Sequence, residues 1–148
     1  MRIEPKIPPI SACETFVLAA WVIALIATLG ALFIGEIMGQ LPCNLCWHQR
    51  AFMFPLAVIL GVASLRGDIG IWRYGLPLAV IGGLIAGFHS LTYAGILPAA
   101  IVPCGEGPSC SGANMTIAGV LPLPYLSLIA FVGIAILLTL ARRRLPND

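Results

Sequence analysis

The sequence predicts an all-α membrane protein, a bundle of four transmembrane helices with both termini in the cytoplasm. Of its 148 residues, 59% are hydrophobic and 9% are charged, whereas soluble domains carry about 25% charged residues. Four apolar stretches, separated by charges and turn residues, make up most of the chain. Too little chain remains for a separate soluble part, so we expect a single integral membrane domain.

The four helices are expected at about residues 15–37, 47–65, 73–97 and 119–141. A spanning helix needs about 20 residues to cross a hydrocarbon core of about 30 Å. The second apolar stretch, residues 51–65, is short by that measure and spans the core only if residues 47–50 lie at its mouth. The first stretch is too long for the apolar part of a signal peptide and lacks a small-residue cleavage motif. We therefore expect it to remain as a helix of the mature protein.

Lysine and arginine residues indicate the orientation of the bundle. Seven of the eight lie before the first helix, between the second and third, or after the fourth: Arg2, Lys6, Arg66, Arg73, Arg142, Arg143 and Arg144. Only Arg50 lies on the other side, and cytoplasmic loops are the ones enriched in these cations. Both termini are thus expected in the cytoplasm, with two loops on the outer, extracytoplasmic face. No basic stripe with interleaved aromatics is present, which excludes a nucleic-acid partner.

The cysteines divide between the two sides of this arrangement. Cys43 and Cys46 lie in the first outer loop, Cys104 and Cys110 lie in the second, and Cys13 lies alone on the cytoplasmic side. Disulfides persist outside the cytoplasm and are reduced inside it. Each outer loop is therefore expected to carry one redox-capable cysteine pair, and Cys13 is interpreted as a bystander.

The first pair has the spacing Cys-x-x-Cys at the start of a predicted helix. If that helix begins near Cys43, then Cys43, Cys46 and Arg50 stand at positions i, i+3 and i+7 on one face. The helix dipole would stabilise a thiolate there, and a cation at the membrane boundary is usually functional. Three other interpretations stay open: a structural disulfide, half a zinc site with His48 as the only obvious helper, and an Arg50 that merely reaches toward water.

The second pair lies in a Gly- and Pro-rich segment, residues 103–112, that is too short to have a core. A cross-link over so few residues removes only roughly 2 kcal/mol of chain entropy, so redox exchange is favoured over simple stapling. His89 lies near the outer end of the third helix. It could bond a carbonyl group of a lipid-soluble ligand, or it could be a core histidine satisfied by a neighbouring helix.

Together these residues carry a family resemblance. The run from Pro42 to Arg50 (Pro-Cys-Asn-Leu-Cys-Trp-His-Gln-Arg), a histidine near the outer end of the third helix, and a second outer cysteine pair resemble the DsbB family of disulfide bond formation proteins. The close spacing of Cys104 and Cys110 and the Pro-containing run at residues 121–131 resemble the shorter BdbC-type branch. The resemblance covers nearly the whole chain.

The resemblance implies a location in a bacterial cytoplasmic (inner) membrane, a function, and a role for each site residue. The partner would be a soluble thioredoxin-fold oxidase of the DsbA type, whose thiolate attacks the Cys104–Cys110 disulfide, first at Cys104. Cys43 and Cys46 would reoxidise that pair, and Cys46 would pass the electrons to a membrane quinone, ubiquinone or menaquinone. Arg50 would hold and polarise the quinone, with His89 as a candidate second contact, and no metal would take part.

Other functions compete with this one. A non-catalytic subunit or transporter with stapled outer loops should carry polar or ionisable residues along its helix interiors, and apart from His89 and tyrosines the four apolar stretches contain no ionisable residue. A metal-binding protein should have further His, Asp or Glu residues near its cysteines, and the sequence offers few. Electron flow in the opposite direction, as in proteins like vitamin K epoxide reductase, stays open.

Overall fold

The computed structural model describes residues 12–97, 116–117 and 121–144. Helix α1 (Ala12–Leu32) continues into a π-helical turn, η1 (Phe33–Ile37), and α2 spans Asn44–Arg66. A short 3-10 turn, η2 (Ile69–Ile71), leads into α3 (Trp72–Tyr93). Strands β1 (Thr116–Ile117) and β2 (Leu121–Pro122) form an antiparallel pair before α4 (Leu123–Arg143). Four helices of the described chain are long and apolar enough to cross a membrane.

The prediction of an all-α membrane bundle with four spans is confirmed, with shifts at the helix ends. Helix α2 begins at Asn44, three residues before the expected start, because Cys43 caps it. Helix α3 ends at Tyr93, and Gly95 follows with a φ of 73°, a left-handed turn that favours glycine. Helix α4 begins at Leu123, where Pro124 in the first turn costs no hydrogen bond.

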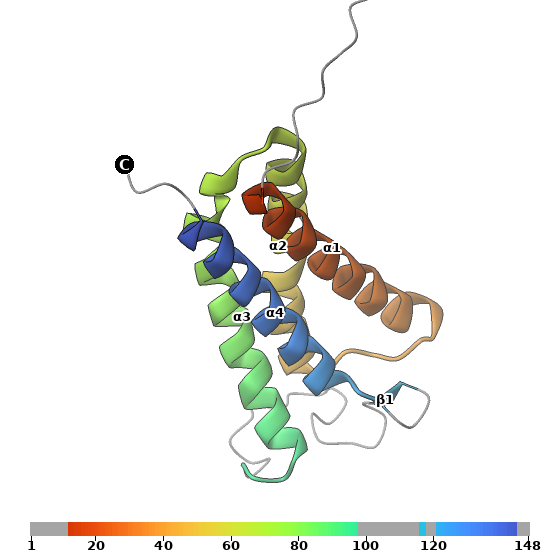
Figure 1. The fold of residues 1–148 in the computed structure, drawn as a ribbon. Helices are drawn as coiled ribbons and strands as arrows, with labels where there is room; N and C mark the ends of the chain where they lie inside the picture. The colour runs from red at the N-terminus through yellow and green to blue at the C-terminus, as the bar shows by residue number, and fades with distance from the viewer. Residues whose placement is uncertain (1–11, 98–115, 118–120, 145–148) are drawn as a thin grey trace, which may run out of the picture.

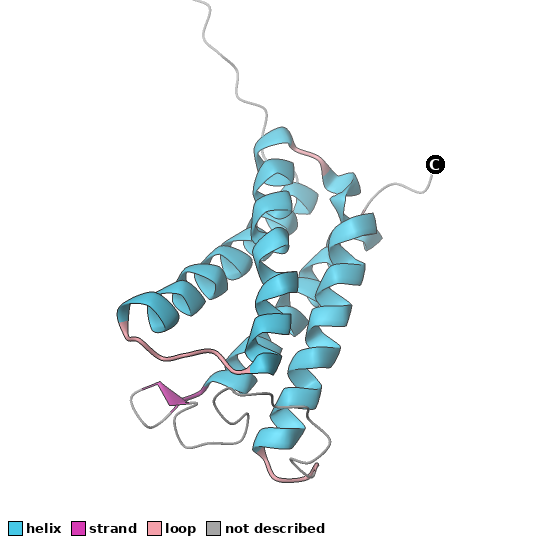
Figure 2. Ribbon diagram, turned by 180° about the vertical axis from the view of Figure 1, so that it is seen from behind, coloured by secondary structure: helices cyan, strands magenta, loops and turns pink. Residues whose placement is uncertain are grey.

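The four helices place chain segments at two opposite ends of the bundle (Figure 1). The start of α1, the turn between α2 and α3, and the end of α4 lie together at one end. The end of α1 and the start of α2 lie toward the other end, and α1 leans away from the remaining helices in that direction (Figures 1 and 2). We call the first the arginine end, for Arg66, Arg73, Arg142 and Arg143, and the second the cysteine end, for Cys43 and Cys46.

Large apolar side chains fill the space between α2, α3 and α4. Leu56, Leu60, Phe131, Ile134 and Leu138 are fully buried in one cluster. Small residues let the helices approach: a Cβ added at Gly82 on α3 would overlap the ring of Phe131 on α4. Between α1 and α2, a Cβ at Gly61 would lie 2.7 Å from Nε1 of Trp21. Close backbone approach through small residues is the usual packing of membrane helices.

At the arginine end, Trp72 lies between two cations. The guanidinium of Arg142 lies 4.6 Å from the centroid of the indole ring, and that of Arg73 lies 5.8 Å from it. The contact with Arg142 ties the last turn of α4 to the first turn of α3, whereas Arg73 is the neighbour of Trp72 on α3 itself. The arginine residues of three different helices are thus gathered at one end of the bundle, opposite the cysteine pair.

Candidate functional site

The first cysteine pair forms the start of α2. Cys43 is the N-cap, with extended φ and ψ of −71° and 171°, and its sulfur accepts a hydrogen bond from the backbone N–H of Cys46 at 3.4 Å. N-cap side chains commonly accept from the third helical residue in this way. The two sulfur atoms lie 3.1 Å apart, and both cysteines are free thiols. The helix start therefore brings the pair together, as its spacing predicts.

The two thiols have unequal surroundings. Cys43 is fully buried against Leu45, Phe88 and Tyr93, whereas Cys46 is partly exposed. A hydrogen bond to Cys46, together with burial, raises the pKa of the Cys43 thiol to about 12, although His89 acts to lower it. In the reduced pair Cys43 therefore keeps its proton and donates it toward the sulfur of Cys46. The two sulfurs of the reduced pair are therefore not equivalent, and Cys43 is the one held in its protonated form.

His89 lies against the buried member of the pair. Its side chain is fully buried on α3, with Nε2 at 3.8 Å from the sulfur of Cys43. Its Nδ1 lies 2.9 Å from Nε2 of Gln49, which is also buried. His48, beside the pair in sequence, is exposed, and its Nδ1 lies 2.9 Å from the carbonyl oxygen of Asn44. The histidine that lies against the cysteine pair is thus His89 on α3, and not His48, which is adjacent in sequence.

Gln49 is a site residue that the sequence analysis missed. It stands one turn after Cys46 on α2, and its amide joins this helix to His89 on α3. Gln49 lies between His48 and Arg50 in the sequence. A polar amide at the start of a membrane helix was the signal that could have identified it. A buried amide requires a partner, and His89 supplies it.

Arg50 is held at the mouth of α2 by contacts with α1. Its Nη2 donates a hydrogen bond of 2.7 Å to the carbonyl oxygen of Ala31, and its guanidinium lies 5.4 Å from the ring centroid of Trp47. The π-helical turn η1 begins two residues after Ala31. Gly35 in that turn leaves room for the guanidinium, because an added Cβ would lie 2.9 Å from Nη2. The cation is therefore fixed by the end of α1.

A cavity of about 570 Å³ lies between α1 and α4, beside the start of α2. Most of its wall is apolar, formed by aliphatic residues of α1 and α4 such as Ile23, Ala27, Leu126 and Ala130. Its polar side chains are those of Gln40, Cys46, Gln49, Arg50 and Ser127. The side-chain oxygen of Gln40 is buried and has no hydrogen-bond partner among the described residues. The space is thus an apolar chamber with a thiol and a cation in its wall.

The described residues that line this chamber do not include His89. The cavity therefore does not support the expected contact of His89 with a lipid-soluble ligand. The surroundings of His89 fit the other interpretation, a histidine satisfied by a neighbouring helix. Cys104 and Cys110, the second predicted pair, lie outside the described residues.

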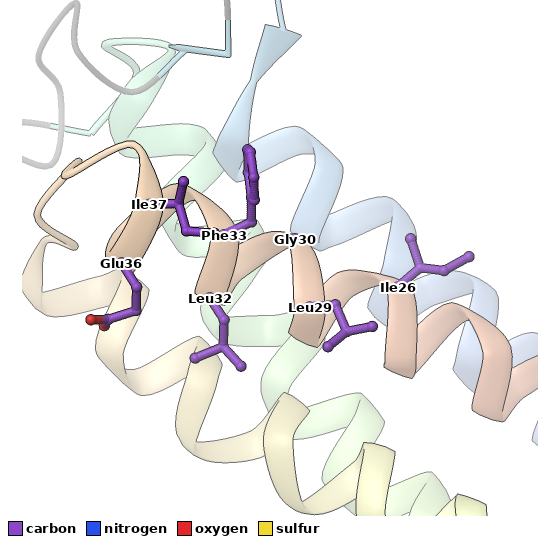
Figure 3. A pocket seen from close by; sticks show the side chains of 7 residues that line it. All are labelled: Ile26, Leu29, Gly30, Leu32, Phe33, Glu36 and Ile37. Atoms are coloured by element: carbon purple, nitrogen blue, oxygen red, sulfur yellow. The ribbon is translucent and has the colours of Figure 1, made fainter.

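A second hollow, of about 690 Å³, lies along α1 and η1 (Figure 3). Its lining residues are Ile26, Leu29, Gly30, Leu32, Phe33, Glu36 and Ile37. Only Glu36 among them has a polar side chain, and neither a thiol nor a cation faces the hollow. We therefore place the candidate site in the first cavity.

Comparison with known proteins gives a consistent result. The profile of the family described as "Disulfide bond formation protein DsbB" matches residues 14–141. The chain is 62% identical over 128 residues to a "Probable disulfide formation protein" of Metapseudomonas resinovorans, covering 86% of this chain and 89% of that protein. It is 43% identical over 127 residues to "Disulfide bond formation protein C" of Bacillus subtilis (strain 168), covering 86% and 92%. No solved structure matches the chain.

The profile spans all four helices and the cysteine pair at the start of α2. Both relatives exceed 40% identity across most of their own length. The chain belongs to the DsbB family of disulfide bond formation proteins.

Proposed function

We propose that this protein reoxidises a DsbA-like thioredoxin-fold oxidase and passes the electrons through Cys104/Cys110 and Cys43/Cys46 to a membrane quinone. It would thereby support disulfide formation in extracytoplasmic proteins. The observation that carries the proposal is the cavity between α1 and α4, because it brings Cys46 and Arg50 to one apolar space. Family membership and four spans make the chain a multi-pass membrane protein of disulfide formation.

The cavity suits a quinone in its chemistry. Its aliphatic wall fits an apolar ring and its tail, and the Arg50 guanidinium supplies hydrogen bonds and positive charge for a carbonyl oxygen. The amide oxygen of Gln40, which has no partner within the described part of the chain, would accept a hydrogen bond from the hydroxyl group of a quinol. When bound, a quinone supplies a two-electron acceptor. Arg50 would stabilise the negative charge that develops there.

The reduced protein partner would be oxidised by thiol–disulfide exchange. A thiolate of the reduced partner attacks Cys104, the Cys104–Cys110 bond breaks, and Cys110 leaves as a thiolate. The second partner thiol then displaces Cys104, so the partner leaves with a disulfide and the loop pair holds two electrons. The loop pair passes these to the Cys43–Cys46 disulfide by the same exchange. Because Cys43 is fully buried, an attack on its sulfur requires the start of α2 to open locally.

An acceptor other than glutathione disulfide is required on energetic grounds. A DsbA-type oxidase has a potential near about −120 mV, and glutathione poises lie at about −200 mV or below. A gap of about 80 mV corresponds to nearly 4 kcal/mol for two electrons, at about 30 mV per 1.4 kcal/mol. Glutathione disulfide therefore recharges such an oxidase poorly, and a quinone dissolved in the bilayer is a suitable acceptor.

The test is turnover by the purified full chain with a reduced thioredoxin-fold partner and ubiquinone or menaquinone. We expect quinol to form in step with partner disulfide. Cys46→Ser should abolish quinol formation, because it removes the thiol that faces the cavity. Arg50→Met should raise the quinone concentration needed for half-maximal rate by roughly tenfold, the effect of about 1.4 kcal/mol. Arg66→Met, at the arginine end, is the matched control and should leave that concentration unchanged.

Two outcomes would contradict the proposal. Quinone that stays unchanged with folded protein and a reduced partner would exclude the oxidase activity and return the chain to a non-catalytic membrane subunit. Full-rate turnover by Cys46→Ser would exclude the assignment of Cys46 as the thiol next to the quinone. Supplying quinol and oxidised partner tests the opposite direction of electron flow in the same assay.

A further inference from the structure

The reduced cysteine pair and His89 have the arrangement of a metal site. The ligand atoms of Cys43, Cys46 and His89 all lie within 4.8 Å of one another. The two sulfurs are 3.1 Å apart, and Nε2 of His89 is 3.8 Å from the sulfur of Cys43. Ligand atoms of a tetrahedral zinc site lie roughly 3.5–3.8 Å apart, given Zn–S of about 2.3 Å and Zn–N of about 2.0 Å. To accept an ion, the two sulfurs must separate by about 0.7 Å, and the sulfur of Cys46 and Nε2 of His89, which lie within 4.8 Å of each other, must come to about 3.5 Å.

The surroundings hold the third ligand in place. His89 is fully buried, and its other ring nitrogen is paired with Gln49. A histidine that binds a metal through Nε2 carries its proton on Nδ1 and donates it to an outer partner. The amide of Gln49 provides an oxygen for that bond once it turns about its last side-chain torsion, since the amide can act as donor or acceptor. The position has the outer support typical of metal ligands.

The charge and the open side of the site favour a soft divalent cation. Two thiolates and one neutral imidazole balance the charge of Zn²⁺, which lowers the cost of placing an ion at the edge of the membrane. Cys46 opens onto the cavity, so a fourth ligand such as water has access. A Cys₂His set with one open position is an established arrangement for zinc.

We propose that the reduced pair Cys43/Cys46 binds a soft divalent cation together with His89, and that the bound ion inhibits the protein. Binding replaces two S–H protons by two metal–sulfur bonds and releases the protons to water, with no change of oxidation state. Thiolates held by the ion are unavailable for disulfide exchange. The ion would therefore keep the pair reduced until it is removed.

The test uses the full chain in detergent with Cys13, Cys104 and Cys110 changed to serine, so that only the Cys43/Cys46 pair can ligate. We titrate the reduced protein with Co²⁺ and follow the visible absorption of tetrahedral cobalt–thiolate. One ion per chain is expected, and Zn²⁺ should displace it. Protein whose Cys43–Cys46 disulfide is closed should bind none.

Two histidine variants make the matched comparison. His89→Ala should weaken Co²⁺ binding at least tenfold, whereas His48→Ala should leave it unchanged, because His48 is exposed and bonded to its own helix. Gln49→Ala should weaken binding by about 10–100-fold, the usual effect of losing an outer partner. If His89→Ala fails to fold, Gln49→Ala and the oxidised protein still test the site.

Equal Co²⁺ affinity in the two histidine variants, or binding that survives oxidation of the pair, would overturn the proposal. In the unmodified protein, Zn²⁺ added to the reduced form should slow partner oxidation, and a chelator should restore the rate. Zinc that binds without slowing the rate would overturn the inhibitory part. The binding measurement needs neither quinone nor partner, so its failure would leave the proposed function untouched.

Discussion

The position of the Arg50 guanidinium depends on Gly35, a residue without a side chain. The guanidinium reaches the carbonyl of Ala31 across the surface of Gly35, where an added Cβ would lie 2.9 Å from Nη2 and 3.4 Å from Nη1. A side chain added at Gly35 would be accommodated by movement of its nearest neighbour, and that neighbour is the guanidinium of Arg50. A substitution at Gly35 would therefore displace the cation from the cavity wall while leaving Arg50 in the sequence.

Gly35→Ala is expected to impair quinone use. The added methyl group pushes the guanidinium away from Ala31, and the half-saturating quinone concentration should rise several-fold, corresponding to about 1 kcal/mol. Quinol formation measured against quinone concentration provides the check. Gly87→Ala on α3 is the control, since a Cβ there would meet only Cδ1 of Leu128 at 3.9 Å, an ordinary contact, and Gly87 is not among the residues that line the cavity. Equal effects of the two variants would contradict the role assigned to Gly35.

Part of the site could be predicted at the residue scale, and part could not. The alignment of Cys43, Cys46 and Arg50 follows from their spacing along one helix, and the structure places all three at the start of α2. The contact of His89 with Gln49 joins residues forty positions apart, so it depends on how α3 packs on α2. Local sequence pointed to His48 instead. The pattern of apolar residues along one helix does not show which residue of another helix it will contact.

At the scale of the helices, α3 and α4 pack at Gly82. The Phe131 ring occupies the place where a side chain of α3 would otherwise lie, and it is fully buried. The next residue differs: a Cβ at Gly83 would lie 3.5 Å from Cβ of Phe131, an ordinary contact. The two adjacent glycines are therefore unequal, although the sequence presents them as a pair.

Gly82→Ala should destabilise the bundle. The new methyl group overlaps the Phe131 ring, and overpacking of this kind typically costs about 1–3 kcal/mol. Gly83→Ala should be close to neutral. The free energy of unfolding in mixed detergent–denaturant micelles distinguishes the two variants. A Gly82→Ala protein as stable as the parent would mean that α3 and α4 separate without cost.

The helix ends show why element boundaries were harder to predict than the helices themselves. The apolar stretches are long enough for their existence to be evident, and all four are present. The start of α2 depends on Cys43 as its cap, a residue outside the preferred set of Ser, Thr, Asp and Asn. The start of α4 follows a two-residue strand that pairs with Thr116–Ile117. Neither interaction leaves a periodic signal.

The orientation of the whole molecule follows from the separation of its two ends. Arginine residues of three helices gather at one end and the cysteine pair lies at the other, so the enrichment of cations on the cytoplasmic side favours an outward-facing pair. The placement of Cys104 and Cys110 on that outer face stays a prediction, because they lie outside the described residues.

Labelling from outside tests this orientation. In protein whose own cysteines are replaced by serine, a new cysteine is introduced either by Met38→Cys, at the cysteine end, or by Asp68→Cys, at the arginine end; both positions are exposed. A membrane-impermeant maleimide added to intact cells should label the first variant and not the second. Opening the cells should make both reactive. The reverse pattern would place the cysteine pair in the cytoplasm.

The burial of Cys43 limits which thiols can reach its sulfur. A free small thiol in the surrounding water has no route to this sulfur, which is enclosed by Leu45, Phe88 and Tyr93. A loop cysteine carried by the same chain has an effective concentration of about millimolar, so it can exploit brief openings that a dilute thiol misses. In the proposed cycle, electrons would therefore reach Cys43 from the tethered loop, and its burial would hinder direct attack on this sulfur by thiols in solution.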